Sequence, residues 1–162
     1  MSDPIIIATC PALAATGAYR VTSPATRNYN CVAWAASRTD RWWWPSPFAY
    51  WPAGVPNEET VAAFEAAYTT LGYRRCPDGR FELAFERLAI FALAGVPKHA
   101  TRQLDNGRWT SKLGKYLDVE HLTADAVGGP MYGHVVSFMR RPRPIWRRVL
   151  ALVRSPFRRP IP

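Results

Sequence analysis

The sequence has few cysteines, no long apolar run and, toward its C-terminus, no acidic residues. The three cysteines among 162 residues have no metal-ligand spacing and leave one thiol unpaired, so they indicate neither a disulfide framework nor a metal site. No run approaches the roughly 18 apolar residues of a membrane-spanning helix, and no signal peptide is recognisable at the N-terminus. We therefore expect a cytoplasmic protein in a reducing compartment, without metal or cofactor.

The absence of acidic residues is confined to residues 140–162, which contain eight arginines and neither Asp nor Glu. Residues 1–139 carry 13 Lys and Arg against 12 Asp and Glu, so the net charge of +9 belongs almost wholly to this C-terminal segment. A nucleic-acid-binding domain normally carries a basic patch on the fold itself. The charge distribution therefore argues against nucleic acid as the partner.

The length of the chain suits one domain, and 48% hydrophobic residues with 20% charged residues is a globular composition. We expect an N-terminal arm over residues 1–27, a folded domain over residues 28–139 and a basic, Arg- and Pro-rich amphipathic tail over residues 140–162. Tryptophan and proline are concentrated in residues 41–56, where the prolines exclude a regular helix and predict a rigid aromatic loop.

Hydrophobic periodicity and turn residues predict helices first and strands afterwards. The expected helices are residues 30–38, residues 57–71 with Asn57 as cap, and a short helix over residues 118–127. The expected strands are residues 73–76, 88–92, 99–104, 108–113 and 133–139, with a hairpin turn at Asp105-Asn106-Gly107. This order predicts an α+β fold in which the helices pack on an antiparallel sheet.

Cys31 is the candidate nucleophile, because it is expected in the first turn of the 30–38 helix. A thiol there faces the positive end of the helix dipole, which favours the thiolate. Asn28 or Asn30 is available as the helix cap. The backbone N–H of Cys31 and the side-chain amide of Asn28 or Asn30 are candidate oxyanion donors.

A cysteine nucleophile needs a base and a group that orients the base. His99 is the best-placed base, at the head of a strand. The orienting group stays open between Asp118 and Ser111. A three-residue hairpin loop would place His99 on the face of Ser111, whereas a two- or four-residue loop would bring Lys112 to that face.

Four tryptophans are candidates for lining a substrate cleft: Trp43, Trp44, Trp51 and Trp109. The alternative is that these rings anchor the loop and fill the core, which is the more common use of clustered aromatic side chains.

Several strings together resemble a bacterial family of uncharacterised domains. They are residues 30–35 (NCVAWA), 42–45 (WWWP), 50–52 (YWP), 99–104 (HATRQL), 106–114 (NGRWTSKLG) and 118–121 (DVEH). The resemblance spans about residues 28–140. The order of a cysteine helix followed by a histidine strand and a hairpin is similar to papain-like and NlpC/P60-like cysteine hydrolases. That similarity implies a papain-like fold, with the third catalytic residue near Ser111, where His, Asn or Asp is more usual.

The leading hypothesis is a cysteine-dependent hydrolase or transferase acting on a peptide, amide or thioester. Cys31 would attack the carbonyl and His99 would move the proton. The alternative is a non-catalytic binding or membrane-associated domain that uses the tryptophan-rich loop and the basic tail.

The tail itself allows two interpretations. Residues 144–154 form a projected helix with Ile145, Trp146, Val149 and Leu150 on one side and Arg147 on the other. Such a helix suits an anionic membrane surface or an acidic protein partner, which would make the protein peripheral to a membrane or an exported effector. In the other interpretation, the apolar side docks on the domain and the arginines are solvated.

Overall fold

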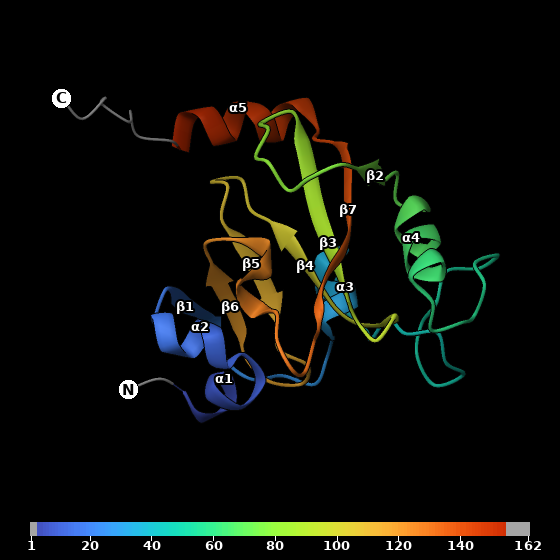
Figure 1. Ribbon diagram of the computed structural model, residues 1–162. Coiled ribbons are helices and arrows are strands. Elements are labelled where there is room, and N and C mark those ends of the chain that lie inside the picture. The colour runs from blue at the N-terminus through green and yellow to red at the C-terminus, as the bar shows by residue number, and fades with distance from the viewer. Residues whose placement is uncertain (1–2, 155–162) are drawn as a thin grey trace.

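The computed structural model describes residues 3–154. It is built on one seven-stranded sheet with the strand order β1-β6-β5-β4-β3-β7-β2, in which every neighbouring pair is antiparallel (Figure 1). The strands are β1 (Tyr19–Ser23), β2 (Arg74–Cys76), β3 (Phe85–Leu93), β4 (Val96–Gln103), β5 (Trp109–Lys112), β6 (Asp118–His121) and β7 (His134–Pro142). The helices are α1 (Pro4–Thr9), α2 (Pro11–Thr16), α3 (Cys31–Ala35), α4 (Val61–Thr69), the 3-10 helix η1 (Ala124–Val127) and α5 (Ile145–Arg154). The predicted α+β class is confirmed.

The two faces of the sheet have separate apolar cores. On one face, α3, α4 and the aromatic loop of residues 41–56 cover Leu88, Ile90 and Ala100. On the other face, α1, α2 and η1 cover Phe91 and Val119. Successive side chains of a strand point to opposite faces, so the strand register decides which core each candidate residue enters.

Residues 4–23 fold onto the domain, so the prediction of an arm over residues 1–27 is wrong for this stretch. Pro4 and Pro11 each begin a short helix, a position where the missing proline N–H costs nothing. Ile6, Cys10 and Leu13 are buried in the second core. Residues 19–23 form β1, which pairs with β6 and closes one edge of the sheet.

Two other predicted elements need correction. Residues 118–121 form β6 rather than the start of a helix, and only the single turn η1 follows. The second helix begins later than expected, because the side chain of Thr60, and not of Asn57, caps α4 by accepting the N–H of Ala63.

The boundary between domain and tail also lies further along the chain than expected. β7 runs to Pro142, so Arg140 and Arg141 belong to the sheet, and α5 follows as a separate helix. No helix within residues 3–154 is long and apolar enough to cross a membrane.

Candidate functional site

Cys31 occupies the first turn of α3, as the sequence predicts, and Asn30 is the cap. The side-chain oxygen Oδ1 of Asn30 accepts the N–H of Ala33 at 3.1 Å and that of Trp43 at 3.2 Å. Its amide nitrogen donates to the carbonyl of Trp43 at 2.8 Å. Asn30 therefore ties the aromatic loop to α3, instead of being free to donate to an oxyanion. Asn28 is exposed, and its backbone N–H donates to Thr26.

The environment of the Cys31 thiol opposes ionisation. The side chain is buried in the first core, and this burial raises its pKa to about 11. The backbone of Ala100 bonds to the sulfur and Lys112 lies close enough to act on its charge, but both effects are smaller than that of burial. The thiol therefore stays protonated at neutral pH.

His99 is directed away from Cys31. Its neighbour Ala100 belongs to the core around α3, so His99 points to the other face of β4. There its ring stacks on Tyr132 at a centroid distance of 4.2 Å and meets Phe91 edge-on at 5.4 Å. Neither ring nitrogen has a hydrogen-bond partner among the described residues, and burial lowers the pKa of His99 to about 3. The structure does not bring the predicted base to the predicted nucleophile.

Ser111 lies on the same face of the sheet as His99, which is the arrangement expected for a three-residue hairpin loop. The connection between β4 and β5 is longer than three residues. Its hydroxyl lies 3.0 Å from Nε2 of His121, whose Nδ1 lies 2.7 Å from the carbonyl oxygen of Thr123. The carbonyl fixes the proton on Nδ1, so Nε2 accepts from Ser111. Ser111 and His121 have no exposed surface, so this pair has no access for a substrate.

Asp118 lies on the same face of the sheet as α3, but it orients no imidazole. Its carboxylate accepts the hydroxyl of Tyr29 at 2.6 Å and that of Ser23, and lies 3.5 Å from Nζ of Lys112. Lys112 has no exposed side-chain surface, and its burial lowers its pKa. This buried network joins β1 and the segment before α3 to the β5–β6 hairpin.

The four candidate tryptophans are used in packing. Trp43 and Trp109 are buried, and Trp44 and Trp51 both pack their rings on Phe64 of α4, at centroid distances of 5.3 and 5.2 Å. The prediction that these rings line a substrate cleft is therefore replaced by the core-filling alternative. The loop does expose one ring fully, Phe48, which is 96% accessible.

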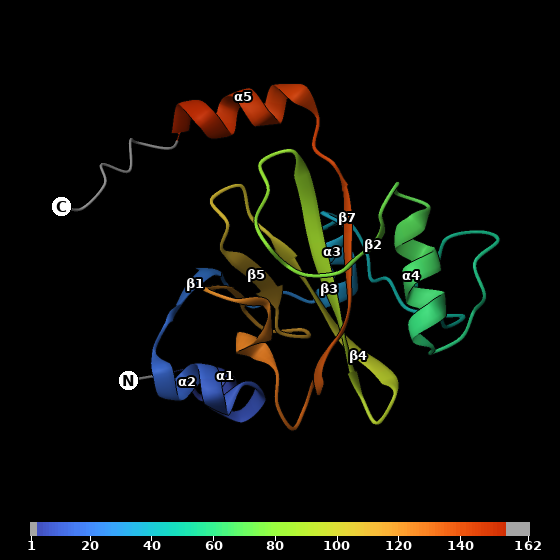
Figure 2. The same ribbon diagram turned by 45° about the horizontal axis from the view of Figure 1, so that its top comes forward.

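α5 lies along one end of the molecule, beyond the ends of β3 and β7 (Figure 2). Its polar side is turned toward the domain. Arg147 pairs with Glu86 of β3 and lies 3.4 Å from Asp105 of the β4–β5 connection. Arg148 donates to the carbonyl oxygens of Arg143 and Ala84.

The apolar side of α5 is consequently turned outward. Ile145 is 75% exposed, Trp146 63%, Val149 54% and Leu150 45%. The alternative in which the helix docks its apolar side on the domain is wrong for the side chains that the structure describes, up to residue 150. The rest of the predicted basic tail, residues 155–162, lies outside the described residues.

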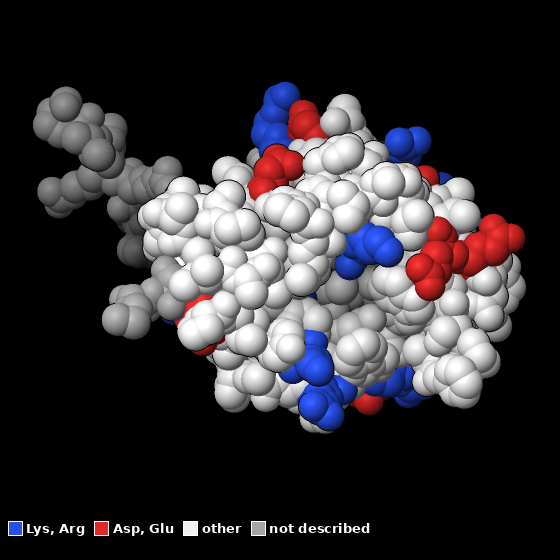
Figure 3. Space-filling model, turned by 60° about the horizontal axis from the view of Figure 1, so that its bottom comes forward, with Lys and Arg blue, Asp and Glu red and all other residues white. Residues whose placement is uncertain are grey.

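Charged side chains on the face shown in Figure 3 do not gather into a basic surface. That side carries small groups of Lys and Arg and of Asp and Glu among mostly uncharged residues. Within residues 3–154, no three His, Cys, Asp or Glu side chains form a group that would hold a metal ion.

The comparisons with known proteins give a family without an assigned activity. No curated protein and no solved structure matches the chain. The family described as "Domain of unknown function (DUF7689)" matches residues 20–140, which is most of the sheet, α3, α4 and the aromatic loop. The chain therefore belongs to this family of domains of unknown function.

Proposed function

We propose that this protein is a non-catalytic domain that attaches reversibly to an anionic membrane surface through the outward apolar side of α5. The observation that carries the proposal is the orientation of the helix. Arg147 and Arg148 hold its polar side on the domain, which fixes Ile145, Trp146, Val149 and Leu150 toward the outside. A helix that lies in a membrane interface presents this kind of apolar face to the lipid.

The apolar side is large enough for reversible binding. Fully burying one Val, Leu or Ile side chain contributes about 1.5–3 kcal/mol. Four side chains that are roughly half exposed thus offer about 3–6 kcal/mol, which is close to the free energy of one myristoyl anchor with a binding constant of about 10⁴ M⁻¹. Trp146 adds a ring of the type that prefers the headgroup region.

An interface anchor of this strength needs a second attraction, and the arginines provide it. Arg140, Arg141, Arg143 and Arg147 pair with only three carboxylates, those of Glu82, Glu86 and Asp105, and Arg148 binds backbone carbonyls. Arg154, Arg158 and Arg159 follow in the sequence without any acidic residue. Because Arg143 is buried and Arg147 and Arg148 face the domain, the proposal assigns the attraction to Arg154, Arg158 and Arg159, at about 1 kcal/mol for each that comes near anionic lipid.

Vesicle flotation tests the proposal. The full chain should float with vesicles that contain phosphatidylserine and should stay behind with purely zwitterionic vesicles. The double substitution Trp146→Ser and Leu150→Ser should reduce the bound fraction about tenfold or more, because it removes half of the exposed apolar side. Phe48→Ser, which removes a more exposed ring from the aromatic loop, is the matched control and should bind like the wild type.

Two results would overturn the proposal. One is flotation that is unchanged by the α5 substitutions. The other is loss of binding in Phe48→Ser alone, which would move the contact to the aromatic loop. Binding of acidic protein without binding to vesicles would favour the other partner class that the arginine-rich tail suggests.

The papain-like cysteine hydrolase, acting on a peptide, amide or thioester, stays a prediction. It requires Cys31 and His99 in hydrogen-bond contact and a thiol that ionises near neutral pH. Within residues 3–154 the imidazole of His99 has no hydrogen-bond partner, and burial raises the pKa of Cys31. We therefore prefer membrane attachment through α5 to the hydrolase hypothesis.

A further inference from the structure

One edge of the sheet is incomplete beside β7. β3 pairs with β7 over residues 134–142, whereas β2, the outer neighbour, pairs only with residues 138–140. Pro77 ends β2 at this point, because proline has no N–H for a further ladder bond. Among the described strands, residues 134–137 therefore have a partner on one side only. Alternate residues of such a stretch direct their N–H and C=O groups to the open side.

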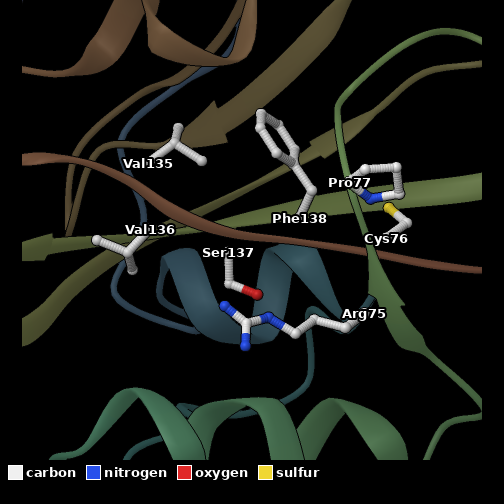
Figure 4. Close-up of a pocket in the computed structure, with 7 residues that line it drawn as sticks. All are labelled: Arg75, Cys76, Pro77, Val135, Val136, Ser137 and Phe138. Carbon is white, nitrogen blue, oxygen red and sulfur yellow. The ribbon is translucent and has the colours of Figure 1, made fainter.

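A notch of about 570 Å³ lies beside this open stretch, lined by Arg75, Cys76, Pro77 and residues 135–138. Its volume falls within the range of about 300–1,000 Å³ that is usual for ligand sites. Figure 4 shows the hydroxyl of Ser137 and the guanidinium of Arg75 on one side of β7, and the side chains of Val135 and Phe138 on the other.

Ser137 is the feature of the notch that the fold alone does not explain. It is only 4% exposed, and its hydroxyl oxygen has no hydrogen-bond partner within the described residues. A buried polar group without a partner is costly, so such groups call for a ligand, a water molecule or another specific reason. Because the notch opens at Ser137, a ligand there would satisfy the hydroxyl.

Arg75 gives the notch its charge. Its side chain is 69% exposed, and its Nε lies 3.2 Å from Oε1 of Glu65, an oxygen that makes no hydrogen bond to any residue the structure describes. Because the arginine end is exposed and the pair makes no hydrogen bond, it holds the guanidinium weakly, by about 1 kcal/mol. The guanidinium is therefore available to a second carboxylate, which it binds with charge-assisted hydrogen bonds.

We propose that an extended acidic peptide adds to the open edge of β7 at residues 134–137. The peptide backbone pairs with the free N–H and C=O groups of β7 and continues the sheet where β2 stops. One Asp or Glu side chain binds Arg75 and accepts the hydroxyl of Ser137. Apolar side chains two residues apart then lie on the opposite side of the added strand, against Val135 and Phe138.

Selection of peptides by the full chain tests this proposal. Random twelve-residue peptides displayed on phage are selected on the wild-type protein, and the enriched peptides are synthesised for calorimetry. We expect an acidic residue next to alternating apolar residues. Binding should weaken about tenfold in Arg75→Glu because a charge-assisted pair becomes a repulsion. Ser137→Ala should weaken binding about threefold without lowering the melting temperature, since the hydroxyl has no partner in the free protein.

Arg20→Glu is the matched control. Arg20 lies on β1 at the other edge of the sheet, is 70% exposed and pairs with Glu120, so it copies Arg75 in exposure and pairing. Binding should be unchanged in this variant. Amide hydrogen exchange should show protection of residues 134–137 by the peptide. The proposal fails if no peptide is enriched, if Arg75→Glu and Arg20→Glu have equal effects, or if the exchange of residues 134–137 is unaffected.

Discussion

Cys31 and His99 lie on neighbouring elements, but β4 turns their side chains to different sides of the sheet. The backbone of Ala100 bonds to the Cys31 sulfur on the side of the sheet that α3 covers. His99 stacks on Tyr132 in the opposite core. Each group is kept neutral by burial, the thiol with a raised pKa and the imidazole with a lowered pKa. A catalytic thiolate–imidazolium pair needs the reverse of both shifts.

Alkylation rates test this description of Cys31. With iodoacetamide at neutral pH, Cys76 should react first, because it is the only partly exposed cysteine of the three. Cys31 and Cys10 should react much more slowly, since burial raises the pKa of each to about 11. Peptide mass spectrometry gives the three rates separately. Fast alkylation of Cys31 that His99→Ala slows would revive the hydrolase hypothesis.

The buried imidazole of His99 predicts acid sensitivity. Its pKa is about 3 when folded and about 6.5 when exposed, so between these values the unfolded chain binds the proton and the folded protein does not. The contribution of His99 to the free energy of unfolding should therefore be fully present above pH 6.5. It should fall as the pH is lowered, by up to about 1.4 kcal/mol per pH unit.

His99→Phe checks the origin of that slope. Phenylalanine keeps a ring against Tyr132 and Phe91 and removes the titrating group. Urea unfolding of this variant between pH 7 and pH 4 should show a shallower loss of stability than the wild type, with His121 unchanged in both. Parallel curves for the two proteins would contradict the burial of a neutral His99.

At the scale of elements, Asn30 joins α3 to the aromatic loop through three hydrogen bonds. Asn30→Ala should therefore lower the free energy of unfolding by about 2–4 kcal/mol, because it removes a helix cap and leaves the backbone of buried Trp43 without partners. Chemical denaturation measures the change. Asn28→Ala, at an exposed site two residues away, should have little effect; equal effects of the two substitutions would refute the role of the clamp.

Elements with a local signature were predictable from the sequence. The cap at Asn30, the hydrophobic run of β3 and the turn after Leu104 all depend on residues close in the chain. α1 and α2 also have a local signal, because Pro4 and Pro11 stand at first helical positions. The segment is short and rich in proline, and this composition is also typical of an arm.

The errors concern contacts between distant residues. β6 is polar in sequence, and Asp118 is buried only because Tyr29 and Lys112 meet it there. The sequence predicts that His99 and Ala100 point to opposite faces of β4. It does not predict which face α3 covers, because the packing of the whole sheet decides this. Neither the open edge of β7 nor the unpaired hydroxyl of Ser137 has a signal in the sequence.

At the scale of the whole molecule, the sheet and its two covering layers bury the predicted catalytic residues, whereas four apolar side chains of α5 face outward. The sequence predicts an amphipathic helix here, but not which side faces the domain. That choice depends on Glu86 and Asp105, which lie about 60 and 40 residues earlier in the chain and bind Arg147.

The most direct test of this account measures the environment of Val149 with and without lipid. The fluorescent thiol reagent bimane is attached to Val149→Cys in a Cys76→Ser background, where the other two cysteines are buried. Emission should report a solvent-exposed label in the free protein and shift to the blue on phosphatidylserine vesicles, while a label at Phe48→Cys does not shift. A label at residue 149 that is already blue-shifted in the free protein and indifferent to vesicles would contradict the outward orientation of α5 and its membrane attachment.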